Sequence, residues 1–371
     1  MGTRGSNDPA SGPDPHEPAA VEPAPRAGLW AALSLVCLWT SAALVYPAIT
    51  KYALYEPGFG GRAGDTGQYV RIYQGAPLRE VIRPFRYRVF TPYLARLAPP
   101  IPHGLLRYFD VTPDKLVQYH FGIANLLGLA VAGLLLVRLC ELLGLGLGQG
   151  LLGALLFYTS FPVVNGAGAP LVDAWAYAFL LMGLVAALRG SLLGLAIASA
   201  VGMFAKETTL LLVPAILLLD RPPAVKFRQL AAMLPGVGLY AVFRFLLFPG
   251  GYGFSSNPAL ALENVIERLR AGPFLWWILF EGFTAFGLLC PLAILGAWSL
   301  RDRARDPLMR LAWLVPLLIV VPFVNAIGIG SGIGKIWFYA FPAMIPLALV
   351  GLRRAVGPRV SLADPLAPAA R

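Results

Sequence analysis

Charged and metal-binding side chains are scarce in this chain. Only 13% of its 371 residues are Asp, Glu, Lys or Arg, and there are three cysteines and three histidines. The cysteines fall in or beside apolar segments, so they do not indicate a redox compartment. The histidines are scattered without the spacing that is typical of metal ligands. The sequence therefore indicates no metal site and no cofactor.

Long apolar segments dominate instead. Hydrophobic residues make up 57% of the chain, more than a soluble protein of this length needs for a large core. Segments of about twenty apolar residues recur, and each is long enough to cross a bilayer. We therefore predict an all-α, multi-pass membrane protein with about ten spans. The expected spans are 28–49, 116–137, 142–160, 170–188, 191–205, 208–219, 229–248, 273–298, 311–328 and 336–352.

The remaining segments define the organisation of the chain. Residues 1–27 are rich in Pro, Ala, Gly and acidic residues, which predicts a disordered cytoplasmic tail. A transmembrane domain is expected over 28–355, and a second cytoplasmic tail over 356–371. The first apolar run is too long for a signal peptide and lacks a cleavage site, so it should be a permanent span. The fifth and sixth spans are short and could form one broken hairpin.

Positive charge is distributed unevenly between the predicted loops. The net charge of +11 suggests cytoplasmic loops and lipid phosphates, not nucleic acid. Because Lys and Arg concentrate in cytoplasmic loops, the richer side should be cytoplasmic, with both termini inside a plasma (inner) membrane. That side has twelve: Arg138, Arg189, Arg221, Lys226, Arg228, Arg301, Arg303, Arg305, Arg310, Arg353, Arg354 and Arg359. The outer side has four: Lys206, Arg268, Arg270 and Lys335.

The segment 51–115 follows the first span and should face outward. It contains ten Lys and Arg residues, but segments longer than about 60 residues are largely exempt from the charge rule. Its stretch APLREVIRPFRYRVFTPYLARLAPPIP is basic and half apolar, which predicts short amphipathic helices on the membrane surface. Prolines should divide these helices. They are Pro77, Pro84, Pro92, Pro99 and Pro100.

Charged residues near or within the apolar spans are costly, so they are candidates for function. In the predicted topology they approach the outer leaflet and share that face with Asp65. They are Asp173, Lys206, Glu207, Arg244, Glu281 and Lys335. A proton relay across the bilayer would need acids at several depths, and the sequence does not have that pattern.

Each candidate also has a purely structural explanation. Asp65 begins the sequence Asp-Thr-Gly-Gln, which matches a helix capping box, and Asp173 could cap the fourth span. Lys206 and Glu207 could be an ordinary interfacial pair. Three basic side chains could simply contact lipid headgroups, namely Arg83, Arg86 and Arg88. Three tryptophans are more typical of an interfacial belt than of a substrate platform, namely Trp276, Trp277 and Trp337.

Several stretches of the sequence resemble one family of membrane enzymes. GDTGQYVRIYQG followed by PFRYRVFTPYLARL is similar to bacterial members of the GT-C glycosyltransferases, which take sugars from polyprenyl-phosphate carriers. GAPLVDAWAYAFLLMG resembles the segment that opens a middle span in the branch that uses dolichol-phosphate-mannose. FAKETTLLLVPAILL and GKIWFYAFPAMIPLAL are similar to later segments of the family. The resemblance covers residues 28–355.

The resemblance implies an inverting hexosyltransferase that acts at the outer membrane face. It would move a sugar from a polyprenyl-phosphate donor to a glycan or lipid acceptor, with Asp65 as the base that deprotonates the acceptor hydroxyl. Cationic side chains would hold the leaving phosphate, for which bidentate arginine is well suited. The expected substrate- and phosphate-binding residues are Arg83, Arg86, Arg88, Asp173, Lys206, Glu207 and Lys335.

The sequence differs from the acid-pair form of the loop motif, because Thr66 follows Asp65. One loop acid is a poor divalent-metal site, so a metal-dependent mechanism is open but not indicated. Two other classes stay open. One is a transporter or flippase for a lipid-linked or anionic substrate, which inverted repeats or paired broken helices would favour. The other is a non-catalytic partner in envelope assembly, and neither of them needs an acid in a surface loop.

Overall fold

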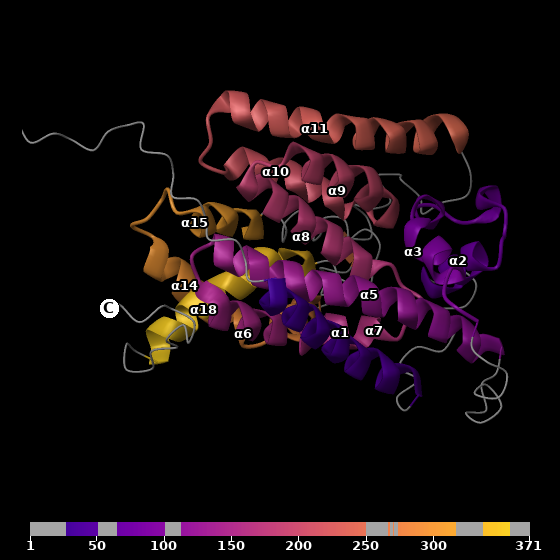
Figure 1. Ribbon diagram of the computed structural model, residues 1–371, viewed down its shortest axis with the longest axis horizontal. Helices are drawn as coiled ribbons and strands as arrows, with labels where there is room; N and C mark the ends of the chain where they lie inside the picture. The colour runs from indigo at the N-terminus through magenta and orange to yellow at the C-terminus, as the bar shows by residue number, and fades with distance from the viewer. Residues whose placement is uncertain are drawn as a thin grey trace, which may run out of the picture.

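The protein is helical throughout its described residues. The computed structural model describes residues 27–50, 65–100, 113–249, 266–267, 270, 274–316 and 337–356. Every secondary-structure element within them is an α-, 3₁₀- or π-helix (Figure 1), so the predicted all-α class is confirmed for this part of the chain. The predicted tails lie almost entirely outside it.

The described helices fall into two halves along the chain. The first half contains α1 (Ala27–Thr50), α2 (Asp65–Tyr73), η2 (Leu78–Glu80), η3 (Phe85–Tyr87), α3 (Phe90–Arg96), α5 (Pro113–Leu142), α6 (Gly146–Tyr158), α7 (Phe161–Ala167), α8 (Asp173–Arg189) and α9 (Leu192–Ala205). The second half contains η4 (Glu207–Leu211), α10 (Leu212–Leu218), α11 (Pro223–Ala241), the π-helix η5 (Val242–Leu247), α13 (Phe274–Phe286), α14 (Leu289–Leu300), α15 (Pro307–Ala312), η6 (Phe338–Ala340) and α18 (Phe341–Val356).

Four helices in the described part of the chain are long and apolar enough to cross a membrane. They cover Gly28–Ala48, Leu116–Leu142, Pro223–Leu247 and Phe338–Val356. A fifth span would be formed by α6 and α7 together, which are bent by 60° relative to each other. These helices are consistent with a membrane protein. The number of about ten spans and the side of the membrane on which each loop lies stay predictions. Most of the expected span at 311–328 lies outside the described residues.

One expected span is interrupted in the structure, and the fifth and sixth spans are separated by a break in the helix. The segment predicted as one span at 273–298 forms α13 and α14, which are separated at Gly287, where φ is +47°. A side chain is strained at this φ, so glycine is the residue that permits the turn. The short fifth and sixth spans form α9 and η4–α10, which are interrupted at Lys206 in an extended conformation (φ −167°, ψ 144°).

The α8–α9 connection shows how the sequence ends one helix and starts the next. α8 ends at Gly190, which has φ +75° and is in the left-handed conformation that favours glycine. The next residue, Ser191, caps α9 because its hydroxyl accepts the backbone N–H of Gly194. The two helices can therefore fold back on each other and pack side by side, as they do in the structure.

The largest apolar core lies around α5 and α8. α5 packs against α1, α6 and α8, while α8 also packs against α9. Most of α8 is buried on all sides, as expected for a helix that is apolar around its circumference. A cluster of aromatic rings joins this core to η6 and α18. The rings of Phe157 and Tyr177 contact those of Phe338 and Phe341.

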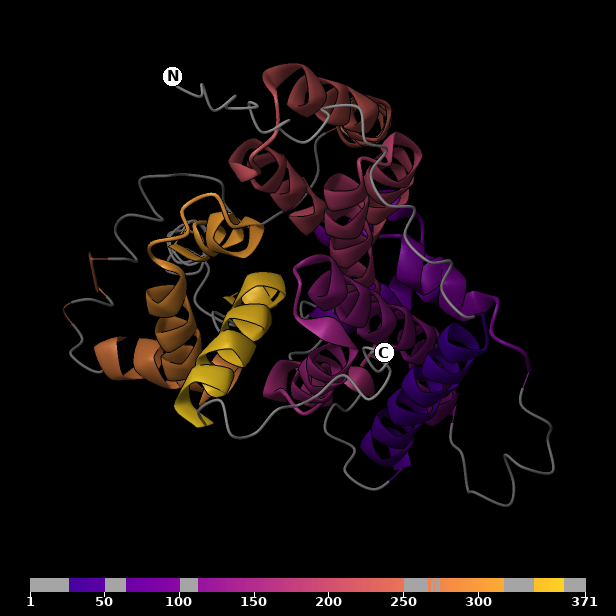
Figure 2. The ribbon, with the colours of Figure 1, turned by 60° about the vertical axis from the view of Figure 1, so that its left-hand side comes forward.

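The C-terminal helix α18 crosses α14 very closely (Figure 2). A Cβ on Gly296 would come within 1.9 Å of the Leu347 carbonyl oxygen, and one on Gly351 within 2.0 Å of the Leu292 carbonyl oxygen. Small residues at a crossing of this kind let two backbones approach, which is a common basis for helix association in membranes.

The segment 65–100 packs onto the ends of the bundle helices. Figure 1 shows α2 and α3 at one end of the structure, beside α5, and α3 also contacts α9. An apolar cluster joins the segment to α5 and to the start of α8. Its buried members are Tyr69, Ile72, Val81, Phe85, Ala95, Val117, Phe121, Ala124, Ala169, Leu171 and Val172. The short helices of segment 65–100 therefore pack against the helices of the bundle.

The prolines divide this segment largely as expected. Pro77 and Pro84 immediately precede the 3₁₀-helices η2 and η3. Pro92 does not separate two helices, since it lies in the first turn of α3, where a missing backbone N–H costs little.

Candidate functional site

The candidate site is built around two ion pairs that share one break in the chain. Lys206 and Glu207 are consecutive residues between α9 and η4, and they do not form the interfacial pair with each other that the sequence left open. Their side chains go to different partners, Lys206 to Asp173 and Glu207 to Arg88. The extended backbone of Lys206 lets neighbouring side chains diverge in this way.

The first pair lies inside the bundle. The Lys206 ammonium is 2.6 Å from the Asp173 Oδ1 atom, and the Tyr339 hydroxyl donates to the same oxygen at 2.7 Å. The ammonium also lies 4.8 Å from the centre of the Tyr339 ring, within the range of a cation–π contact. Together with Tyr339, this pair connects the start of α8 and the end of α9 to η6, which is far from them in the sequence.

Asp173 is therefore not a simple helix cap. It is the first residue of α8, and the capping position is occupied by Val172, which offers no side-chain oxygen. The Asp173 carboxylate instead accepts from Lys206 and Tyr339. Because the residue is only 5% exposed, these partners offset the cost of burying its charge.

The second pair connects the segment 65–100 to the bundle. The Arg88 Nε atom donates to Glu207 Oε2 at 2.8 Å, and its Nη1 atom donates to the Tyr69 hydroxyl oxygen at 3.1 Å. The Tyr240 hydroxyl donates to the other carboxylate oxygen of Glu207, also at 2.8 Å. A continuous polar chain thus runs from α2 through Arg88 and η4 to α11.

The pKa of Tyr69 responds to Asp65 as well as to members of this chain. Burial raises the pKa of Tyr69, Arg88 opposes that change, and the negative charges of Asp65 and Asp173 raise it further. Burial lowers the pKa of Arg88, but Tyr69 and Glu207 outweigh it, so the net shift is upward. The Arg88 guanidinium therefore stays charged. Asp65 and Asp173 both act electrostatically on Tyr69.

Asp65 is exposed at the start of α2. A negative charge in the first turn is favourable there, because the helix N-terminus carries partial positive charge. Gln68, the expected partner in a capping box, uses its Oε1 atom to accept the backbone N–H of Ile82 at 3.0 Å. That bond ties α2 to the following loop, while the Asp65 carboxylate lies at the edge of the site.

The three predicted arginines have different surroundings. Arg88 is in the ion pair with Glu207. Arg86 is only 2% exposed, and burial lowers its pKa, with a further lowering by the nearby Arg83 charge. Arg83 and Arg86 therefore form a region of positive charge close to, but distinct from, the Arg88–Glu207 pair.

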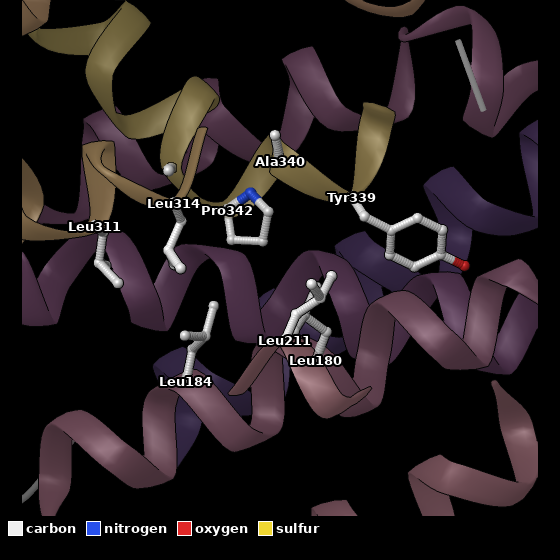
Figure 3. A pocket seen from close by; sticks show the side chains of 9 residues that line it. Leu180, Leu184, Leu211, Leu311, Leu314, Tyr339, Ala340 and Pro342 are labelled. Carbon is white, nitrogen blue, oxygen red and sulfur yellow. The ribbon is translucent and has the colours of Figure 1, made fainter. Parts of the chain in front are cut away.

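A narrow apolar pocket lies on the bundle side of Tyr339 (Figure 3). Side chains of α8, α15 and α18 line it, including Leu180, Leu184 and Leu311. It has room for about one water molecule. As it stands, this pocket is too small for a lipid chain.

Two other predicted residues cannot be placed from the part of the chain that the structure describes. Lys335 lies outside the described residues, and the same is true of the Glu281 side chain. The Arg244 guanidinium lies 5.2 Å from the centre of the Tyr87 ring. Trp276 is 76% exposed, in agreement with a belt position, but Trp337 is buried and does not fit that expectation.

Three tyrosines of the site were not identified from the sequence. Tyr69 could have been found, since it lies one helical turn after Asp65 and therefore on the same face. Tyr240 and Tyr339 lie in separate helices, and no local pattern connects them to the acids that they contact. Among the residues that the structure describes, no three His, Cys, Asp or Glu side chains come together in a way that could hold a metal ion.

Comparisons with protein-family models, with curated proteins and with solved structures find no match for this chain. Its function must therefore be inferred from the residues and their geometry.

Proposed function

We propose that the protein is a membrane glycosyltransferase that uses a polyprenyl-phosphate-linked sugar, with Asp65 as the general base. The observation that carries the proposal is the position of Asp65. Asp65 is an exposed acid at the start of α2, and Tyr69 of the same helix contacts the Arg88–Glu207 pair on a bundle of apolar helices.

The chemistry of the reaction needs these groups. Asp65 removes the proton from the acceptor hydroxyl as that oxygen attacks the anomeric carbon, and the sugar–phosphate bond breaks with inversion. The leaving phosphate gains negative charge, which arginine stabilises well. Arg83 and Arg86 are the favoured phosphate ligands, and Lys335 stays a candidate. No step requires a metal ion.

Lipid-linked donors also require contact with the hydrocarbon region. Large apolar side chains are exposed along α1 and α11, including Trp39, Phe227 and Leu234. Such surfaces are unfavourable in water but suited to lipid. They support a membrane location and a donor whose polyprenyl chain stays in the bilayer while its phosphate reaches the polar site.

The test compares Asp65→Asn with wild type in sugar transfer from a panel of polyprenyl-phosphate sugars. The substitution keeps the size of the side chain but removes the proton acceptor, so transfer should fall by about 10²- to 10⁴-fold. Arg79→Asn, at an exposed position of the same segment, is the control and should transfer at the wild-type rate. Full activity of Asp65→Asn would refute the assignment of this carboxylate as the base.

A second candidate function is transport or flipping of a lipid-linked anion. The break between α9 and η4 favours it, because interrupted helices with charged residues line substrate sites in transporters. Movement of a labelled polyprenyl-phosphate sugar across proteoliposomes, without transfer to an acceptor, would support this alternative. If neither transfer nor movement is detected, the non-catalytic role in envelope assembly becomes the better explanation.

A further inference from the structure

We infer that Glu207 is a positioning residue, which holds α2 and its Asp65 against the bundle through Arg88 and Tyr69. Arg88 then serves this connection and does not bind the substrate phosphate. The consequence for catalysis rests on the proposed function of Asp65, whereas the connection itself can be tested without any substrate.

The contacts form an uninterrupted path from the bundle to α2. Tyr240 on α11 donates to Glu207, Arg88 donates to the other oxygen of Glu207, and Arg88 also donates to Tyr69 on α2. Each donor–acceptor distance is between 2.8 and 3.1 Å. Hydrogen bonds that involve charged groups are the stronger ones, so this path can determine where α2 lies.

Aromatic contacts make the outer end of the path rigid. The rings of Tyr69 and Phe85 meet edge to face with their centres 5.6 Å apart. The Arg88 guanidinium lies 5.8 Å from the centre of the Phe85 ring. Tyr69, Phe85 and Arg88 therefore contact one another in a group, and a displacement of Arg88 would be transmitted to α2.

The inner end of the path is fixed independently. Lys206, the residue before Glu207, is held by Asp173 and Tyr339 inside the bundle. The Lys206 carbonyl also accepts the Thr209 hydroxyl at 3.1 Å. The backbone next to Glu207 is therefore fixed by contacts that do not involve the segment 65–100.

The same geometry makes Arg88 unsuitable as the phosphate ligand. An anion that bound its guanidinium would lie beside the Glu207 carboxylate, only 2.8 Å from Arg88, and like charges repel strongly where water is partly excluded.

The experiment measures hydrogen exchange of the α2 amides in detergent for Glu207→Gln, Arg88→Gln and the double variant. Glu207→Gln keeps the shape of the side chain but removes the charge, and it leaves one acceptor oxygen for the two donors Arg88 and Tyr240. Each single change should speed exchange of α2 by about 10- to 150-fold, as for loss of a hydrogen bond to a charged group. The double variant should add little, since both changes break the same connection.

Two further variants keep the test decisive. Arg79→Gln changes an exposed arginine of the same segment that lies outside α2, and it should leave α2 exchange unchanged. If Glu207→Gln and Arg88→Gln do not fold, Tyr69→Phe provides the same test. It removes only the hydroxyl that accepts from Arg88 and should speed exchange of α2 by several-fold. Wild-type exchange in Glu207→Gln, or in Tyr69→Phe where the former cannot be made, would overturn the inference.

Kinetics then separate positioning from phosphate binding. If Arg88 positions Asp65, Arg88→Gln should lower kcat with little change in KM for the polyprenyl-phosphate sugar. If it binds the phosphate, KM should rise while α2 exchange stays at the wild-type rate, and the inference would be wrong. A wild-type protein that transfers no sugar would refute the proposed function, but the exchange results would still decide whether Glu207 holds α2.

Discussion

The two ion pairs at the Lys206–Glu207 break differ in what they join. Asp173–Lys206 connects helices within the bundle, and its side chains are 7% and 11% exposed. Arg88–Glu207 connects the segment 65–100 to the bundle, and its side chains are 14% and 20% exposed. Charges interact more strongly where water is excluded. The inner pair should therefore matter most for stability, and the outer pair for the placement of α2.

Removal of Lys206 is the most severe way to test this difference. Lys206→Ala leaves the Asp173 carboxylate buried without its cation, which should lower the free energy of unfolding by about 3–5 kcal/mol. The measurement is thermal or denaturant unfolding in detergent.

Lys226→Ala is the matched control for the lysine change. Lys226 is partly exposed, and its ammonium donates to the Leu217 carbonyl at 2.8 Å. Its removal should change stability by no more than about 0.5 kcal/mol. Equal effects of the two substitutions would show that the Asp173–Lys206 pair has no special importance.

Tyr339 tests the hydrogen bonding of the inner pair alone. Tyr339→Phe keeps the ring under the Lys206 ammonium but removes the hydroxyl that donates to Asp173. Loss of a hydrogen bond to a charged group should cost about 1.5–3 kcal/mol, again measured by unfolding. Retention of wild-type stability would mean that the carboxylate does not depend on the Tyr339 hydroxyl.

Arg86 sharpens the contrast between arginines. Burial and the Arg83 charge lower the pKa of Arg86, which favours an anion nearby, so Arg86→Ala should weaken binding of a polyprenyl-phosphate sugar by about 10- to 150-fold. Arg88→Gln should weaken it much less. Isothermal titration of both variants measures the difference, and a larger loss for Arg88→Gln would reverse the assignment.

The sequence predicts the chemistry of this site better than its connections. Asp65, Asp173, Lys206 and Glu207 stand out because charge is rare and costly beside apolar segments. Their partners do not, since Tyr339 is 166 residues from Asp173 and Arg88 is 119 from Glu207. Whether consecutive residues pair together or separately depends on the backbone at Lys206, which local propensity does not determine.

The fold shows a similar division. Apolar runs predict helices well, and the Gly190–Ser191 turn has recognisable end and start signals. The break at Gly287 was missed because a lone glycine also occurs inside helices of membrane proteins. The number of spans is harder still, because lengths such as those of α9 and α8 suit a buried helix as well as a membrane span.

Asp65→Asn should have a smaller effect on stability than the changes to the inner ion pair. Asp65 is exposed, and a charge in the first turn of a helix contributes about 0.3–1 kcal/mol. Asn keeps the size and the capping ability of Asp, so the free energy of unfolding should fall by less than about 1 kcal/mol. Exchange of the α2 amides should stay close to wild type, in contrast to Glu207→Gln. An Asp65→Asn protein that loses both transfer and protection of α2 would show that Asp65 helps to hold the helix, and its assignment as a base would then need a separate proof.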